Sequence, residues 1–380
     1  MIDVLTSFRF IAAFFVFLHH TINSGKGFGE RGVTYFFILS GFILAYRYYD
    51  KFYKRLEAKD VLSFYSSRVS RIYPIHLLTF FMAILFSMIA PSHFYLHNAP
   101  ANLLLMQSLF PKDIFTYNPA SWSLSVEMTF YILFPFLIFA LSKIILRGKP
   151  VSNIRFSVLF VLLFLVFFVQ AVVVLYVKDT QPPMSLRWWL MYVSPFRASD
   201  FSVGVILSLI YMKCKRAQVF TDNSRAFSKQ SLGFTILEAS AVLLVLVSFY
   251  KPIFNLNAAM FSVNYVPSLA FLILVFSFQN GLFSKVLKHK AFVFLGEISF
   301  SFFMLHYFIM AFFHGTLNLQ GKRISLPILL VSLILSAVTY KFFELPSRDK
   351  LRNIFSRLTD KFISRRSSVE LQAATKEEEL

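Results

Sequence analysis

RFIAAFFVFLHH, residues 9–20, is the stretch that decides the fold. Nine of its twelve residues are apolar, and it lies in an apolar run, 5–22, about long enough to cross a bilayer as a helix. It nevertheless begins with an arginine and ends with two histidines. An arginine inside a span costs at least about 2.5 kcal/mol and usually faces protein or a water-filled cavity. The stretch therefore predicts a membrane helix whose ionisable groups face a protein interior.

The composition extends this prediction to the whole chain. Of 380 residues, 57% are hydrophobic and only 15% are charged, against about 25% in a typical soluble domain. The single cysteine, Cys214, excludes an intramolecular disulfide and a multi-cysteine metal site, and we expect no bound metal. We therefore predict an all-α fold, a polytopic transmembrane helical bundle in the lipid bilayer.

Hydropathy divides the chain into about ten predicted spans. They are 5–22, 32–49, 71–90, 123–141, 155–177, 190–212, 234–250, 258–279, 292–314 and 325–344. Lysine and arginine are concentrated in alternate loops and after the last span, which indicates that this side is cytoplasmic. An even number of spans places both termini there. We expect a transmembrane domain, 1–346, and a disordered cytoplasmic tail, 347–380, basic and then acidic and without chemistry.

The net charge of +19 raises the question of a nucleic-acid partner. The basic residues lie between apolar runs, as determinants of membrane topology do, and form no separate basic domain. We therefore expect no nucleic-acid binding.

Arg9 and His20 are eleven residues apart in the first span. At 100° per residue they lie about 20° apart around the helix and about 16 Å apart along it. With a cytoplasmic N-terminus, His20 lies toward the outer boundary. Two interpretations remain open: Arg9 reaches the inner headgroups while the histidines sit at the outer interface, or both line an internal polar site.

Further polar residues within the predicted spans favour an internal site. Arg197 and Asp200 are spaced i, i+3 on one helix face and are expected to pair. Ionisable groups in membrane spans tend to converge on a shared cavity. The candidates on the later spans are Glu127, Arg197, Asp200, His306 and Glu344.

The segment RVSRIYP, 68–74, places Arg68 and Arg71 at i, i+3 where the third span meets the cytoplasm. One interpretation is a topology signal. The other is a guanidinium clamp for phosphates. Pro74 is expected in the first turn of this helix, where free backbone N–H groups would add to an anion site.

These motifs together resemble the acyltransferase-3 family of integral membrane O-acyltransferases. The resemblance runs from Leu5 to about Arg348. Three departures from the family pattern are Thr6 in place of an aspartate, and Phe300 and Phe303 in place of tyrosines. The segments that carry the resemblance are LTSFRFIAAFFVFLHH, GVTYFFILSGFILAYRY with Ser40, RVSRIYPIHLL, SWSLSVEMTFYILFP with Trp122, SPFRASDFSVGVILS, SFSFFMLH and FFELP.

The resemblance implies transfer of an acyl group, expected to be acetyl, from acyl-CoA to a hydroxyl of a cell-envelope glycan or glycolipid at a bacterial inner membrane. Acyl-CoA would be a substrate, with no permanently bound cofactor. Arg68 and Arg71 would hold the donor phosphates. His20 would act as general base, with Glu127 orienting it or carrying a second proton. Arg9 would neutralise a donor phosphate or a buried acid.

Some alternatives stay open. Trp122 is expected to anchor the outer interface rather than stack on a sugar ring. Intramembrane ionisable groups also fit a proton-coupled secondary transporter of a small glycoside or acid, although no inverted repeat is visible. A non-catalytic scaffold is a third interpretation. Loss of ester-linked acyl groups in His20→Ala would favour the enzyme, and loss of proton-coupled uptake the transporter.

Overall fold

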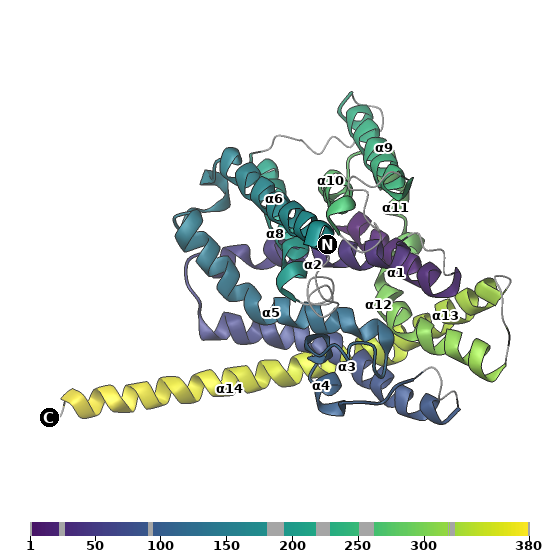
Figure 1. Ribbon diagram of the computed structural model, residues 1–380. Coiled ribbons are helices and arrows are strands. Elements are labelled where there is room, and N and C mark those ends of the chain that lie inside the picture. The colour runs from purple at the N-terminus through teal and green to yellow at the C-terminus, as the bar shows by residue number, and fades with distance from the viewer. Residues whose placement is uncertain are drawn as a thin grey trace.

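The computed structural model describes residues 2–22, 27–89, 94–180, 194–217, 229–250, 262–317, 319 and 324–378, which fold into a bundle of helices (Figure 1). Within these residues there is no β-strand, as the sequence predicts. The long helices are α1 Asp3–Ile22, α2 Phe28–Phe52, α3 Ala58–Ile89, α5 Trp122–Ala140, α6 Phe156–Thr180, α8 Ser194–Arg216, α9 Lys229–Tyr250, α10 Val266–Ser277, α12 Lys290–Ala311, α13 Ser325–Thr339 and α14 Leu345–Glu378.

Short helical turns connect several of the long helices. Three of them are five-residue π-helical turns that prolong α5, α12 and α13. The short elements are α4 Ala99–Leu103, η2 Gln107–Leu109, η3 Pro119–Ser121, η4 Leu141–Ile145, η5 Val151–Asn153, η7 Ser262–Asn264, α11 Leu282–Leu287, η8 Phe312–Thr316 and η10 Tyr340–Glu344.

Eight helices among the described residues are long and apolar enough to cross a membrane, so the chain is a multi-pass membrane protein. They correspond to eight of the ten predicted spans. The other two predicted spans, 190–212 and 258–279, begin outside the described residues. Their described parts form α8, which carries a charged pair, and α10, which has only twelve residues.

The outer helices expose apolar side chains, as a lipid-facing surface requires. On α6 one such face follows i, i+4 spacing, with Phe160, Phe164 and Phe168 each more than half exposed. Helices α9 and α13 carry similar exposed leucines and isoleucines, including Leu243 and Ile334. These helices therefore form the rim of the bundle and not its core.

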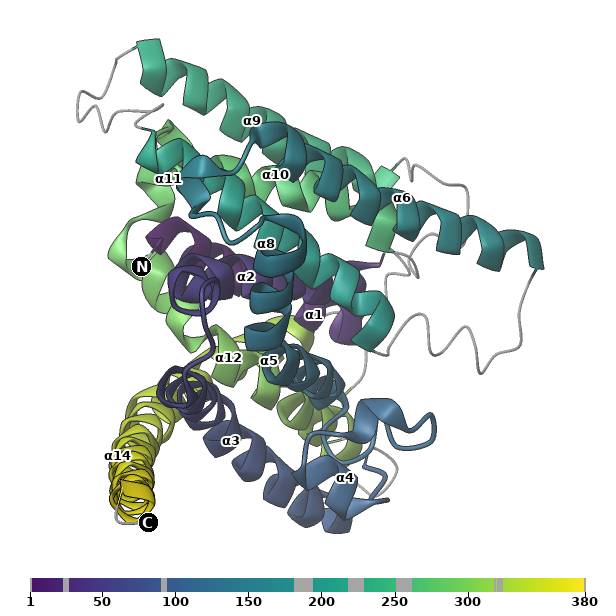
Figure 2. The same ribbon diagram turned by 90° about the vertical axis from the view of Figure 1, so that its left-hand side faces the viewer.

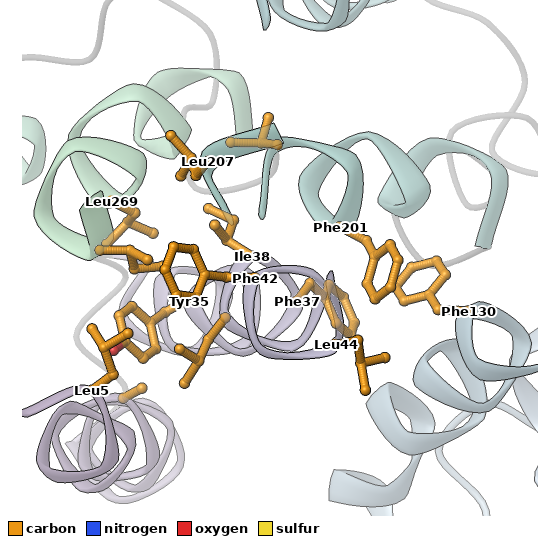
Figure 3. Packing of buried hydrophobic residues seen from close by; sticks show 14 of the residues in the cluster. Leu5, Tyr35, Phe37, Ile38, Phe42, Leu44, Phe130, Phe201, Leu207 and Leu269 are labelled. Carbon is orange, nitrogen blue, oxygen red and sulfur yellow. The ribbon is translucent and has the colours of Figure 1, made fainter. Parts of the chain in front are cut away.

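Helix α2 lies at the centre, between α1, α5, α8 and α10. Figure 3 shows its side chains Phe37, Ile38 and Phe42 among residues of the surrounding helices. Contact with α8 is backbone to backbone: a Cβ on Gly41 would lie 2.0 Å from the Phe201 carbonyl oxygen. Such close packing of small residues is typical of membrane helices.

Helices α1 and α12 meet in the same way. A Cβ on Gly296 would lie 1.9 Å from the carbonyl oxygen of Thr6. The two helices run in the same direction, since Thr6 meets Gly296 near their starts and His20 meets His306 further along both; they carry Arg9, His20 and His306. Their contact fixes the spacing of these side chains.

One expectation about α3 was wrong. Helix α3 begins at Ala58, so Pro74 lies deep inside the helix and the expected free N–H groups beside Arg68 and Arg71 are absent there. Helix α14 extends from Leu345 to Glu378. It leaves the bundle beside α3 (Figures 1 and 2).

Candidate active site

One cavity of about 120 Å³ brings together five residues predicted from the sequence. They come from four helices: Arg9 from α1, Ser40 from α2, Arg68 and Arg71 from α3, and Glu127 from α5. The rest of the wall is mostly apolar. It consists of Leu5, Thr6, Phe36, Phe37, Leu39, Ile43, Leu44, Arg47, Ile72, Ser123, Leu124, Tyr131, Phe300 and Phe303.

A fourth arginine, Arg47, lines this cavity and was not predicted. It follows Ser40 by seven residues, which places both on one face of α2 about two turns apart. This seven-residue spacing is visible in the sequence and could have predicted that Arg47 faces the same site as Ser40. With Arg9, Arg68 and Arg71, it gives four guanidiniums and one lining carboxylate, Glu127. A low-dielectric cavity with this excess of cations is suited to bind a polyanion.

Glu127 is held by two hydroxyl groups. Ser40 Oγ donates to its Oε1 at 2.8 Å, and Tyr131 OH donates to the same oxygen at 2.5 Å. Tyr131 lies one turn after Glu127 on α5 and was missed by the sequence reasoning. Both hydroxyls donate, so Glu127 is the acceptor of this cluster.

The arginines are held in two different ways. Arg68 is buried, donates from Nε to Ser67 Oγ at 3.2 Å, and lies 5.8 Å from the ring centre of Tyr131. Arg9 is attracted by Glu127 and Glu344 and repelled by Arg71. Among the described residues, no carboxylate oxygen lies within 4.0 Å of an Arg9 nitrogen. Its guanidinium therefore keeps hydrogen-bonding capacity for a ligand.

Glu344 lies behind the cavity and does not line it. It is the last residue of the π-turn η10, it is 4% exposed, and it accepts a hydrogen bond from Ser301 Oγ at 2.6 Å. Arg9, Arg71 and Arg348 all attract its charge. Glu344 thus balances part of the positive charge from the α12–α14 side of the bundle.

His20 and His306 form a direct pair. His20 Nδ1 lies 2.8 Å from His306 Nε2, and the rings are nearly parallel. His306 Nδ1 lies 3.2 Å from the Phe302 carbonyl oxygen, which can only accept a hydrogen bond. In a neutral pair His306 therefore carries its proton on Nδ1, accepts at Nε2 from His20 Nδ1–H, and leaves the lone pair of His20 on Nε2.

The structure separates this pair from the arginine cavity, although the sequence predicted one shared pocket. Neither histidine is among the lining residues. Phe303 lies between the two sites: it lines the cavity, and its ring centre is 6.2 Å from that of His306. Glu127 contacts hydroxyl groups of the cavity, and the partner of His20 is His306.

The remaining predicted site residues lie elsewhere. Arg197 and Asp200 pair at 3.2 Å as expected, but they are buried with Gln170, whose Nε2 donates to Asp200 at 2.9 Å. Neither lines the cavity. Trp122 begins α5, is half-buried, and packs edge-on against Phe37. These groups support the bundle around the cavity.

Comparison with known proteins identifies the family of the chain. The family described as Acyltransferase domain matches residues 2–341, nearly the whole chain. The chain belongs to the acyltransferase-3 family. It is therefore an acyltransferase of the membrane.

Two bacterial proteins of known name are similar to the chain. The chain is 30% identical to Acyltransferase MdmB of Streptomyces mycarofaciens over 303 residues, which are 75% of this chain and 69% of MdmB. It is 22% identical to O-acetyltransferase OatA of Staphylococcus aureus (strain NCTC 8325 / PS 47) over 377 residues, 94% of this chain. The chain spans only 59% of the length of OatA. No solved structure matches the chain.

Proposed function

We propose that this chain moves an acetyl group from acetyl-CoA to a hydroxyl of a glycan or glycolipid in the envelope of a bacterium, from within the inner membrane. One observation carries the proposal: four arginines line a cavity with a single carboxylate, in a membrane acyltransferase whose first helix also carries a paired histidine. The name of OatA, an O-acetyltransferase, supports acetyl as the transferred group.

The arginine cavity receives the donor in this proposal. Arg47, Arg68 and Arg71 lie toward the inner side, where the phosphates of coenzyme A would bind. The cavity of about 120 Å³ is too small for a nucleotide, since small-molecule sites usually occupy about 300 Å³ or more. It suits the slender thioester arm. Arg9 then lies beside this arm, partway to the histidines.

His20 acts as the general base. Its Nε2 lone pair takes the proton of the acceptor hydroxyl as the oxygen attacks the thioester carbonyl carbon. The tetrahedral intermediate collapses, the C–S bond breaks, and the thiolate of coenzyme A takes the proton from His20. His306 accepts the Nδ1–H of His20 throughout and keeps the lone pair on Nε2. The thioester reaches His20 once the Phe303 ring turns aside.

A deletion strain tests this function. Strains lacking the gene are complemented with the wild-type chain, His20→Ala or His19→Ala, and alkali-labile acetate is measured on purified envelope glycans. His19 is the matched control because its ring lies edge-on to that of His20 without joining the His20–His306 hydrogen bond. We expect His20→Ala to lose the ester and His19→Ala to keep it, at equal membrane abundance.

Two results would overturn the proposal. One is ester content that does not change on deletion. The other is a His20→Ala strain that retains ester but loses proton-coupled uptake of a glycoside or acid, which would identify a transporter.

A further inference from the structure

A second, larger cavity of about 440 Å³ shares Arg47 with the first and lies between α2, α3 and α14. Its wall comes from α2, α3 and α14. The lining residues are Arg47, Tyr48, Lys51, Lys59, Ser63, Ser66, Ser67, Arg352, Ser356, Thr359 and Asp360. We call the first cavity, lined by Arg9 and Glu127, the inner cavity, and the second, lined by Arg352 of α14, the outer cavity. The inner cavity has a mostly apolar wall, whereas the outer cavity has no aliphatic side chain among its described lining residues.

The polar residues of the outer cavity follow helical spacing on both of its long walls. On α14, Arg352, Ser356 and Thr359 lie at i, i+4 and i+7, on one helix face. On α3, Lys59, Ser63 and the serines that follow repeat the same spacing. The two faces are turned toward each other across the cavity. A stripe of cations and hydroxyls on each side is a surface that donates hydrogen bonds.

The charge in the outer cavity is strongly positive. Four of its lining residues are cationic and only Asp360 is anionic. One cation, Lys51, is already paired with Asp60 at 3.1 Å. Arg47 shares this cavity with Arg352, and Arg68, Arg71 and Arg352 all repel its charge. Such a cluster is unfavourable without an anion, so it points to an anionic ligand.

Arg47 belongs to both cavities. The two cavities therefore adjoin each other at this side chain. A ligand with a bulky, highly charged head and a thin, mostly apolar arm would place the head in the outer cavity and the arm in the inner cavity. The outer volume of about 440 Å³ falls in the usual range for small-molecule sites, about 300 to 1,000 Å³.

We infer that the outer cavity binds the phosphorylated nucleoside of the acyl donor and that α14 supplies part of this site through Arg352. The inference rests on the proposed function and assigns a binding role to a tail that the sequence left without one. An anionic lipid headgroup shares the phosphate chemistry. A lipid also needs an apolar wall for its chains, which the described lining of the outer cavity does not offer.

Binding measurements on the full chain in phosphatidylcholine nanodiscs test the inference. The probes are radiolabelled acetyl-CoA, S-acetylpantetheine, which lacks the nucleotide, and adenosine 3′,5′-bisphosphate as competitor. The variants are Arg352→Ala, Ser356→Asp and Arg357→Ala. Arg357 is the matched control, because it is exposed on α14 five residues after Arg352 and does not line the cavity.

We expect Arg352→Ala to raise the Kd for acetyl-CoA about tenfold, as loss of one charge-assisted contact does. Ser356→Asp should raise it further, and Arg357→Ala should leave it unchanged. Binding of S-acetylpantetheine should not depend on Arg352. The bisphosphate should compete with acetyl-CoA on the wild-type chain.

Other outcomes separate the competing explanations. An unchanged Kd for acetyl-CoA in Arg352→Ala, or an equal loss of S-acetylpantetheine binding, overturns the inference. An effect of Arg352 that appears only with phosphatidylglycerol, without competition by the bisphosphate, assigns the cavity to a lipid headgroup and also overturns it. A wild-type chain that binds the bisphosphate through Arg352 but not acetyl-CoA overturns the proposed donor and leaves the cavity as an anion site.

Discussion

Removing the acceptor that His306 offers to His20 is the sharpest test of the histidine pair. His306→Leu replaces the buried imidazole with an apolar side chain of similar volume, so the fold around it is retained. His20 then loses its 2.8 Å hydrogen bond and with it the fixed position of its own proton. Half of the His20 side chains would then present N–H to the acceptor hydroxyl instead of a lone pair.

The magnitude follows from these two effects. A neutral hydrogen bond contributes about 0.5–1.5 kcal/mol. If this bond stabilises only the ring orientation of His20 that is active in catalysis, its loss lowers the rate by a factor of about 2 to 12. An even mixture of the two tautomers costs about another factor of two. We therefore expect kcat to fall about 4- to 25-fold, with the KM for acetyl-CoA unchanged because the donor binds in the arginine cavity.

His306→Gln is the matched rescue. Its side chain places an amide oxygen close to the position of Nε2, where it can accept from His20 Nδ1–H. We expect this variant to stay within about threefold of the wild type. The assay is the initial rate of label transfer from radiolabelled acetyl-CoA into alkali-labile ester, in membranes that contain the endogenous acceptor, per amount of protein. A glutamine variant as slow as the leucine variant would refute the positioning role, as would a leucine variant with normal kcat.

Three further outcomes are expected. Gly204→Ala should destabilise the fold by about 1–3 kcal/mol, seen as a lower Tm of the detergent-solubilised protein, because a Cβ would lie 1.9 Å from the Ile38 carbonyl oxygen. Gly233→Ala, with open space around the added Cβ, should not lower the Tm. Arg197→Ala should reduce membrane abundance by removing the arginine that neutralises the buried Asp200, a loss of about 3–5 kcal/mol, while activity per molecule stays normal. Phe303→Ala should raise the rate with butyryl-CoA relative to acetyl-CoA severalfold, since its ring closes the cavity toward the histidines.

The sequence was a good guide wherever helical periodicity determines the geometry. It predicted an all-helical membrane protein, the i, i+3 pairing of Arg197 with Asp200, and five of the residues that line the arginine cavity, although not Arg47 or Tyr131. These predictions hold because a polar side chain on a membrane helix has few places to go except the protein interior.

What the sequence could not supply depended on contacts between distant segments. His20 lies 286 residues before its partner His306, and no local pattern connects them. Pro74 was placed at a helix start because proline favours the first turn, but packing of α3 against its neighbours carries the helix sixteen residues further back, to Ala58.

The glycine contact between α1 and α12 has a mechanical consequence. The backbones touch at Thr6 and Gly296 and cannot approach or slide there without a collision. Any change in the angle between the two helices must therefore be a rotation about this contact. His306 lies ten residues beyond it, a lever arm of about 15 Å, so a change of about 4° in crossing angle would move the imidazole by about 1 Å. A small rotation about the Thr6–Gly296 contact would therefore be enough to break the hydrogen bond between His20 and His306.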